Sequence, residues 1–306
     1  MEIKLQEIYD LYGLVEAVND STYESHSIIV KDSELNTVVL RISKKMEVEV
    51  GKIYHFHGKG EVFKDKNYIA VLSLVSLDDD KDMSDDDKRA LKDKFFGGIV
   101  IDEEAYIKDI EDSIDSIENK IIKDITLDIY NKYKNEFVVS PAAVKFHHAY
   151  KGGLMYHTHS VLMLGKAYIK QYPHINKDLV YSGIILHDIA KIIEMSDGKF
   201  TLEGKLFGHI SLGTALVFTS AERLGYSDAE EAKLLAHVIL SHHSEPDFGS
   251  PRRPQIIEAL IVHLCDMSDA KIQPVVEALS RTKPLEFTEP IQTNDKEKFY
   301  KHKLSK

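Results

Sequence analysis

The chain of 306 residues is 43% hydrophobic and carries 39 Lys and Arg against 50 Asp and Glu, a formal net charge of −11. This balance is that of a globular protein of about two domains and excludes a disordered or collagen-like chain. The single cysteine, Cys265, excludes an internal disulfide and a thiolate zinc cluster, which leaves His and carboxylate side chains as metal ligands. No apolar run has the ~20 residues of a membrane span and residues 1–20 do not resemble a signal peptide, so we expect a cytoplasmic protein without membrane contact.

Short β-branched segments separated by turn residues fill residues 27–77, which favours a small all-β unit. Gly58 and Gly60 suit a bulge in a curved barrel strand. The segment Val50–Val71 resembles the later strands of a nucleic-acid-binding OB-fold, so we predict an OB-like domain over residues 1–77. The predicted strands are Ile28–Val30, Thr37–Ile42, Lys52–His57 and Tyr68–Val75. The aromatic residues that could stack on bases are Tyr54, Phe56, Phe63 and Tyr68. Because successive side chains of a strand point in opposite directions, some of these four must instead face the core.

The segment from residue 78 to residue 136 is the acidic part of the chain. Residues 78–139 have a net charge of −9, against −3 for residues 1–77 and +1 for residues 140–306. Residues 78–94 are predicted to be a solvated linker and a helix start, because acidic residues favour the N-terminal end of a helix. Isoleucines recur every three or four residues from Ile107 to Ile129, which predicts one long amphipathic connector helix. That helix makes self-association conceivable, and the sequence leaves the oligomeric state open.

Residues 137–281 have helical patterns and no strand pattern. We predict that Ser140 caps a helix that begins with Pro141, and that Ser227 and Glu230 form a capping box. Residues 282–306 are predicted to be an extension, a subunit contact or disordered. The fold expected overall is multi-domain α+β, with a small β-barrel followed by an all-α bundle. The predicted helices are Leu154–Ile169, Leu179–Lys191, Gly208–Leu224, Ala229–His242 and Gln255–Lys271.

A His-Asp dipeptide, His187-Asp188, ends an apolar helix within the segment that holds 12 of the 15 histidines. The imidazole can bind one ion, while the two oxygens of the carboxylate can bridge two ions at the ~3.5–4 Å separation used in phosphodiester chemistry. Other His and Asp residues stand at helix ends or on apolar helix faces, and a helical bundle that gathers such residues is a common form of di-metal site. A buried Asp266 would be costly without a cation or hydrogen bonds. The further candidates are His157, His209, His242 and Asp266.

The order of these residues resembles that of the HD-domain metal-dependent phosphohydrolases, and the elements Gly208-His209-Ile210 and Ser241-His242-His243 are similar to the two-metal form. Three longer phrases, residues 147–154, 201–210 and 239–251, together with the OB-like segment, resemble the YhaM-type 3′-5′ exoribonucleases. The resemblance implies a hydrolase that removes nucleotides from the 3′ ends of single-stranded RNA, with single-stranded DNA as a further candidate. It also implies an HD domain over residues 137–281.

The resemblance implies the metal ligands, and the positions of other residues in the sequence predict their roles. His157, His187, Asp188 and Asp266 would hold a first divalent ion, and Asp188 would bridge to a second ion held by His209 and His242. Mn²⁺ is the expected metal, and Fe, Co or Zn suit the same ligands. Asp188 is the expected catalytic residue together with Lys191, which would contact a phosphate. The expected substrate-binding residues are Arg252, Arg253, His243, His147 and His148, of which His243 has a ligand or orienting role as its alternative.

Two other functions fit parts of the sequence. The first is an HD-domain hydrolase of a small nucleotide or cyclic dinucleotide, in which the β-unit serves regulation or assembly. The second is a non-catalytic RNA-binding scaffold, and the complete set of six ligands argues against it because a scaffold does not need them.

Overall fold

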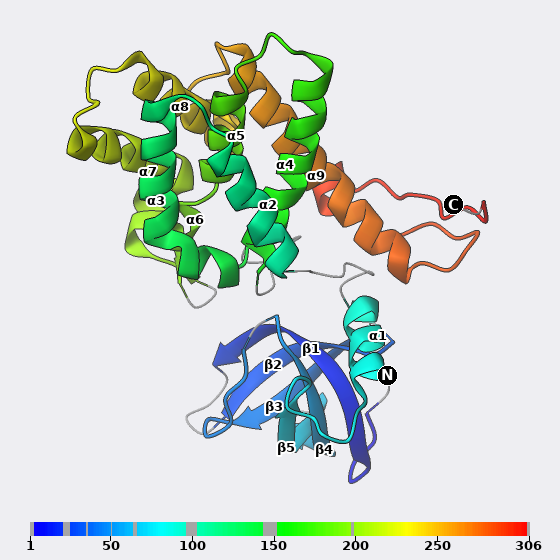
Figure 1. Cartoon of the computed structure of the whole chain (residues 1–306). Helices are drawn as coiled ribbons and strands as arrows, with labels where there is room; N and C mark the ends of the chain where they lie inside the picture. The colour runs from blue at the N-terminus through cyan, green and yellow to red at the C-terminus, as the bar shows by residue number, and fades with distance from the viewer. Residues whose placement is uncertain are drawn as a thin grey trace. The chain divides into compact units, whose positions relative to one another are not determined.

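The computed structural model describes residues 3–20, 25–34, 36–49, 51–63, 66–95, 103–142, 152–196 and 199–304. The chain forms two compact units, which are described separately (Figure 1). One unit comprises Met1–Val100, Val275–Gln292 and Lys296–Lys306, and the other comprises Ile101–Pro274 and Thr293–Asp295. Within these described ranges, no helix combines the length and the apolar character needed to cross a bilayer.

The first unit contains a closed five-stranded barrel, in which the strands follow the order β1-β2-β3-β5-β4 around the barrel. β3 and β5 pair in parallel, and the other neighbouring strands pair antiparallel. This confirms the predicted OB-like barrel. The strands are β1 (Ile8–Asp20), β2 (Ser25–Asp32), β3 (Thr37–Ser43), β4 (Ile53–Phe63) and β5 (Lys66–Ser76).

Strand β1 lies outside the region in which the sequence predicted strands, because that prediction began at residue 27. The barrel in fact begins at Ile8 and closes through pairing of β1 with both β2 and β4. The alternation of apolar and polar residues in β1 is interrupted by Gly13 and by a register shift between Val15 and Ala17, so the strand has no clean period of two. The prediction of the first strand failed for this reason.

The register of β4 with β5 shifts between His57 and Gly58, where the unpaired extra residue is Leu72 of β5, so the bulge predicted for the glycine-bearing strand lies in its partner strand. A Cβ atom at Gly58 would lie 2.6 Å from Cγ2 of Ile69, so the closely packed strands exclude a side chain there. Tyr54 and Phe56 are 5% and 1% exposed and belong to the barrel core, so they are not base-stacking residues. The rest of this core is Val15, Ile28, Val30, Val38, Leu40, Ile42, Ile69 and Val71.

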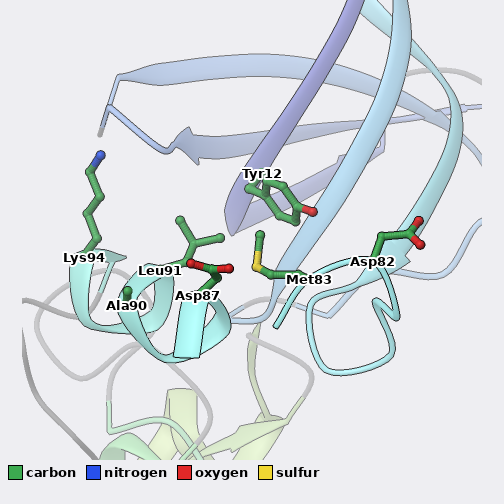
Figure 2. A pocket seen from close by; sticks show the side chains of 7 residues that line it. All are labelled: Tyr12, Asp82, Met83, Asp87, Ala90, Leu91 and Lys94. Carbon is green, nitrogen blue, oxygen red and sulfur yellow. The ribbon is translucent and has the colours of Figure 1, made fainter. Parts of the chain in front are cut away.

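Helix α1 (Asp85–Phe95) follows the barrel and begins with three aspartates, as predicted for the acidic segment. The preceding loop is anchored to the barrel, because Asp80 is 4% exposed and accepts a hydrogen bond of 2.7 Å from the Tyr12 hydroxyl. The prediction of a solvated linker is therefore wrong at Asp80. A pocket lies beside Tyr12 where β1 meets α1 (Figure 2), and its lining comprises Tyr12, Asp82, Met83, Asp87, Ala90, Leu91 and Lys94.

The second unit is a helical bundle around one apolar core, to which the apolar faces of the helices contribute. A short hairpin of β6 (Met195–Ser196) and β7 (Lys199–Phe200) interrupts it, although the sequence predicted no strand in this half. The helices are α2 (Glu103–Asp115), α3 (Lys120–Val139), α4 (Gly153–Gln171), α5 (Lys177–Leu186), α6 (Lys191–Glu194), α7 (Leu202–Leu224), α8 (Glu230–Ser241) and the part of α9 (Ile257–Arg281) before Val275, with a 3₁₀ turn at Pro246–Phe248. A further 3₁₀ turn, Gln292–Asn294, spans a boundary between the units.

The predicted single connector helix is two helices, α2 and α3. The side chain of Asn119 accepts hydrogen bonds from the backbone amides of Ile121 and Ile122 and so begins α3. The carboxylate of Asp178 accepts the amide of Asn119 at 2.8 Å and stabilises the break. Isoleucines of both helices are buried in the bundle core, so this segment is part of the helical unit.

Two predicted helix caps are also wrong. Ser140 is the C-cap of α3, where its amide donates to the Glu136 carbonyl. Ala229 is the N-cap of α8 and makes no side-chain hydrogen bond. Residues 282–304 contain isolated antiparallel bridges between Phe287 and Tyr300 and between Ile291 and Glu297.

Candidate metal centre

The bundle brings together the side chains that the sequence predicted as metal ligands. Each stands on a different part of the fold: near the start of α4, at the end of α5 and just beyond it, at a kink in α7, at the end of α8, and within α9. Together with His243 they form two groups, and within each group the possible ligand atoms lie within 4.8 Å of one another. One group is His157, His187 and Asp266, and the other is Asp188, His209, His242 and His243.

In the first group the two imidazoles face each other. Nε2 of His157 lies 3.2 Å from Nε2 of His187 and 3.3 Å from Oδ1 of Asp266. Nε2 of His187 lies 3.8 Å from the same oxygen. Both histidines are at least 97% buried, since their exposed fractions are 3% and 0%. The three atoms converge on one point of the interior.

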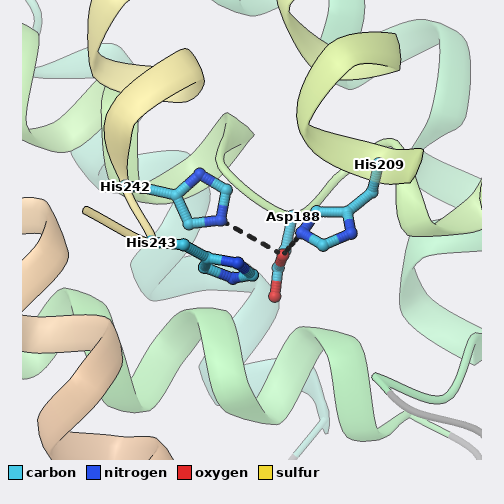
Figure 3. A group of neighbouring side chains, drawn as sticks. All are labelled: Asp188, His209, His242 and His243. Carbon is cyan, nitrogen blue, oxygen red and sulfur yellow. Dashed lines mark ion pairs between the residues drawn. The ribbon is translucent and has the colours of Figure 1, made fainter. Parts of the chain in front are cut away.

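In the second group the imidazoles of His209 and His242 flank the carboxylate of Asp188 (Figure 3). Oδ1 of Asp188 lies 3.3 Å from Nε2 of His209 and 3.8 Å from Nε2 of His242. The other oxygen, Oδ2, lies 3.4 Å from Nε2 of His187 and 3.5 Å from Nε2 of His157. Asp188 therefore stands between the groups and turns one oxygen toward each.

The peptide backbone fixes the tautomer of His187 and of His242. Nδ1 of His187 donates to the Ile184 carbonyl, and Nδ1 of His242 donates to the Ile239 carbonyl, each at 2.7 Å. A carbonyl oxygen can only accept, so Nδ1 carries the proton in both rings and Nε2 presents its lone pair. Both rings are thereby oriented for coordination through Nε2.

Two buried carboxylates that sequence reasoning missed orient the remaining pair of histidines. Oδ2 of Asp269 lies 2.7 Å from Nδ1 of His157, and Oε1 of Glu194 lies 3.1 Å from Nδ1 of His209. The sequence spacing could have pointed to these two carboxylates, because Asp269 follows Asp266 by three residues and Glu194 follows Lys191 by three. Residues at this spacing share a helix face.

Several polar atoms of the centre are buried and unpaired. Oδ1 of Asp188, Nε2 of His209 and Nε2 of His242 have no hydrogen-bond partner among the residues that the structure describes. Burying such atoms uncompensated is costly, and these three are all acceptors that point at one another. A divalent cation would satisfy all three, and imidazole with carboxylate suits Mn, Fe, Co or Zn.

The charges in the centre support one another. Burial opposes ionisation of Asp188, but Lys191 and His187 outweigh it and hold the pKa of the carboxyl well below its ordinary value. Nζ of Lys191 lies 2.7 Å from Oδ2 of Asp188. Burial also opposes a charge on His157, yet hydrogen bonds with Asp266 and Asp269 raise its pKa to about 10. In the metal-free protein, a proton on His157 therefore balances the carboxylates.

The other predicted site residues differ in their distance from this centre. Nε2 of His243 lies 3.9 Å from Oδ2 of Asp266, which places His243 in the centre itself. Arg252 and Arg253 are exposed, and Arg253 pairs with Glu245 at 2.7 Å. His147 and His148 lie outside the described residues.

Comparison with known proteins agrees with this geometry. Residues 154–271 match the HD domain family. The chain carries an HD domain. All six predicted metal ligands lie within the HD domain. The chain is also 43% identical over 201 residues to the 3′-5′ exoribonuclease YhaM of Geobacillus sp. (strain WCH70), a match that covers 65% of this chain and 62% of that relative. The match thus spans less than two thirds of the relative's length. It confirms the resemblance to the YhaM-type proteins that the motifs predicted.

Cys265, which precedes Asp266 in the HD domain, is expected to be inert. The thiol is fully buried, and burial together with the charge of Asp266 raises its pKa to about 12. The raised pKa lowers the thiolate fraction of the folded protein by about a thousandfold. We expect a thiol reagent at mildly alkaline pH to label the folded protein at least a thousandfold more slowly than the urea-unfolded chain. Equal labelling rates would contradict the burial of Cys265.

Proposed function

We propose that this protein is a metal-dependent phosphodiesterase that removes nucleotides one at a time from the 3′ end of single-stranded RNA, and that it also accepts single-stranded DNA. The observation that carries the proposal is the position of Asp188, with one oxygen facing each group of histidines. The HD domain and the exoribonuclease relative support the same chemistry and substrate.

The proposal assigns two divalent ions, with Mn²⁺ as the expected metal. His157, His187 and Asp266 would hold the first together with Asp188. His209 and His242 would hold the second together with the other oxygen of Asp188, and His243 is placed to assist. Ions bound there would supply Lewis acidity toward the phosphate and a nucleophile at neutral pH.

The protein's own side chains would bind and orient the scissile phosphate. The Lys191 side chain is 18% exposed and its ammonium group lies beside Asp188, so it can reach from the centre toward a bound phosphate oxygen. The exposed Arg252 and Arg253 can bind phosphates farther along the strand. To bind a phosphate, Arg253 would have to break its ion pair with Glu245.

The test uses metal-stripped protein reloaded with Mn²⁺ and a 5′-labelled single-stranded RNA. We expect a descending ladder of labelled products, which shows removal of nucleotides from the 3′ end. A circular RNA of the same sequence should stay intact, because it offers no end. Metal-stripped protein and Asp266→Asn should give no ladder, whereas Asp247→Asn, which changes an exposed residue, should match the wild type.

Other product patterns would overturn the proposal. Release of the labelled mononucleotide at once would indicate the opposite polarity, and cleavage of the circle would indicate an endonuclease. Intact RNA, with hydrolysis of a nucleotide or cyclic dinucleotide instead, would assign the HD domain to a small-molecule substrate.

A further inference from the structure

The two groups of the metal centre have the same pattern of outer contacts. In each, one imidazole donates Nδ1–H to a backbone carbonyl at the end of a helix, at 2.7 Å. The other imidazole donates Nδ1–H to a buried carboxylate, which is Asp269 for His157 and Glu194 for His209. A carbonyl holds a ring in place, whereas a carboxylate also makes the ring a more basic ligand.

Asp269 is fixed from two sides. It is 5% exposed and lies three residues after Asp266 on α9. Its Oδ2 binds His157, and its Oδ1 accepts the hydroxyl of Ser160, which stands on α4 with His157. The carboxylate therefore fastens the His157 ring of α4 to the helix that supplies Asp266.

Glu194 is fixed by the backbone around it. It is 9% exposed, and its Oε1 accepts both the amide and Nδ1–H of His209, at 2.9 and 3.1 Å. The amide can reach this oxygen because Gly208 adopts φ +67°, which kinks α7 just before His209. The carbonyl of Glu194 accepts the Thr201 amide at 3.0 Å, and Gly204 packs against that carbonyl without room for a Cβ.

We propose that Asp269 and Glu194 are positioning residues, one for each ion, and that they set the affinities of the two ions separately. The inference rests on the two-ion arrangement proposed above. Removing one charge should lower the basicity and the alignment of one histidine and leave the other group unchanged.

The experiment measures Mn²⁺ bound per chain by equilibrium dialysis over a range of free Mn²⁺. The wild type should bind two ions. In Glu194→Gln and in Asp269→Asn, one ion should bind 10- to 100-fold more weakly and the other with unchanged affinity. Glu194→Ala should bind this ion more weakly than Glu194→Gln does, because the side-chain amide of Gln retains an oxygen that can accept Nδ1–H of His209. The matched control is Asp109→Asn, which removes a carboxylate bonded to His159 outside the centre, and it should bind as the wild type does.

A second background identifies which ion is affected. In His242→Ala, which removes a ligand of the second group, Asp269→Asn should weaken the remaining ion and Glu194→Ala should not. The melting temperatures of the variants in excess chelator should stay close to that of the wild type. This result would show that a lower affinity for Mn²⁺ does not come from unfolding. If Asp269→Asn does not fold, Ser160→Ala removes only the hydroxyl contact of Asp269 and should weaken the first ion alone.

The results separate this inference from the proposed function. Wild-type affinities in the Glu194 and Asp269 variants, or loss of both ions in either variant, would overturn the inference. Failure of the wild type to bind ions would overturn the two-ion proposal and this inference with it. Two ions that respond separately in a protein that leaves RNA intact would refute only the proposed substrate.

Discussion

Under the proposed function, Asp188→Asn is expected to lower the rate of RNA hydrolysis by about a thousandfold or more, the largest loss of activity that we expect from a single substitution. The carboxylate turns one oxygen toward each group of histidines, at 3.3–3.5 Å. Asn is nearly isosteric but places an amide donor where one group needs an acceptor. Ion-dependent stabilisation of the transition state is worth several kcal/mol, and each ~1.4 kcal/mol changes a rate tenfold.

The measurement is the single-turnover rate of RNA cleavage in saturating Mn²⁺, together with the Mn²⁺ bound per chain. We expect fewer than two ions on Asp188→Asn, because the shared ligand is lost. Asp109→Asn again serves as the matched control and should retain the wild-type rate. A variant that kept a tenth of that rate would show that Asp188 is not shared by the reacting ions.

Binding of the first ion is expected to release a proton and to tighten as the pH rises. The pKa of His157 is about 10 in the metal-free protein, because its bonds to Asp266 and Asp269 outweigh the effect of burial. Below that pH the ring is protonated, and an ion must displace the proton before it can use Nε2. The apparent affinity should therefore rise roughly tenfold per pH unit, about a thousandfold from pH 6 to pH 9, and level off near pH 10.

Calorimetric titration of Mn²⁺ in two buffers of different ionisation enthalpy counts the protons released. We expect about one proton from His157 as the first ion binds at neutral pH. His159→Gln, which changes a histidine outside the centre, should release as many protons as the wild type. An affinity independent of pH, with no proton released, would show that Nε2 of His157 is already deprotonated or does not bind the ion.

The residues that the structure gathers into the two groups could be predicted from the sequence, whereas a spacing of three residues was the only sign of the carboxylates that orient them. His187 and Asp188 are adjacent, and the other predicted ligands stand in segments that resemble those of a known family. The contact of Asp269 with His157 depends on how α4 packs on α9, and neighbouring residues do not encode it. Glu194 reaches His209 only because Gly208 adopts a positive φ, a feature of the backbone that a helical pattern hides.

The errors in the fold have local causes. The isoleucine repeat is continuous from Ile107 to Ile129, but α2 ends at Asp115 and the side chain of Asn119 begins α3, while both helices bury their isoleucines. The spacing of apolar residues indicates which residues are buried, but it does not indicate where one helix ends and the next begins. Tyr54 and Phe56 were ambiguous because the facing of a strand is set by its register, which the sequence alone did not fix.

The contact between His157 and Asp269 joins residues 112 positions apart, so it closes only when the chain between them has folded. An unfolded chain cannot present these ligands together, and an ion that binds the native centre therefore stabilises the native state by mass action. In the proposed enzyme, metal supply would then govern the stability of the protein as well as its catalysis. A cell depleted of the ion would hold a less stable protein that opens more often and is cleared by proteases sooner.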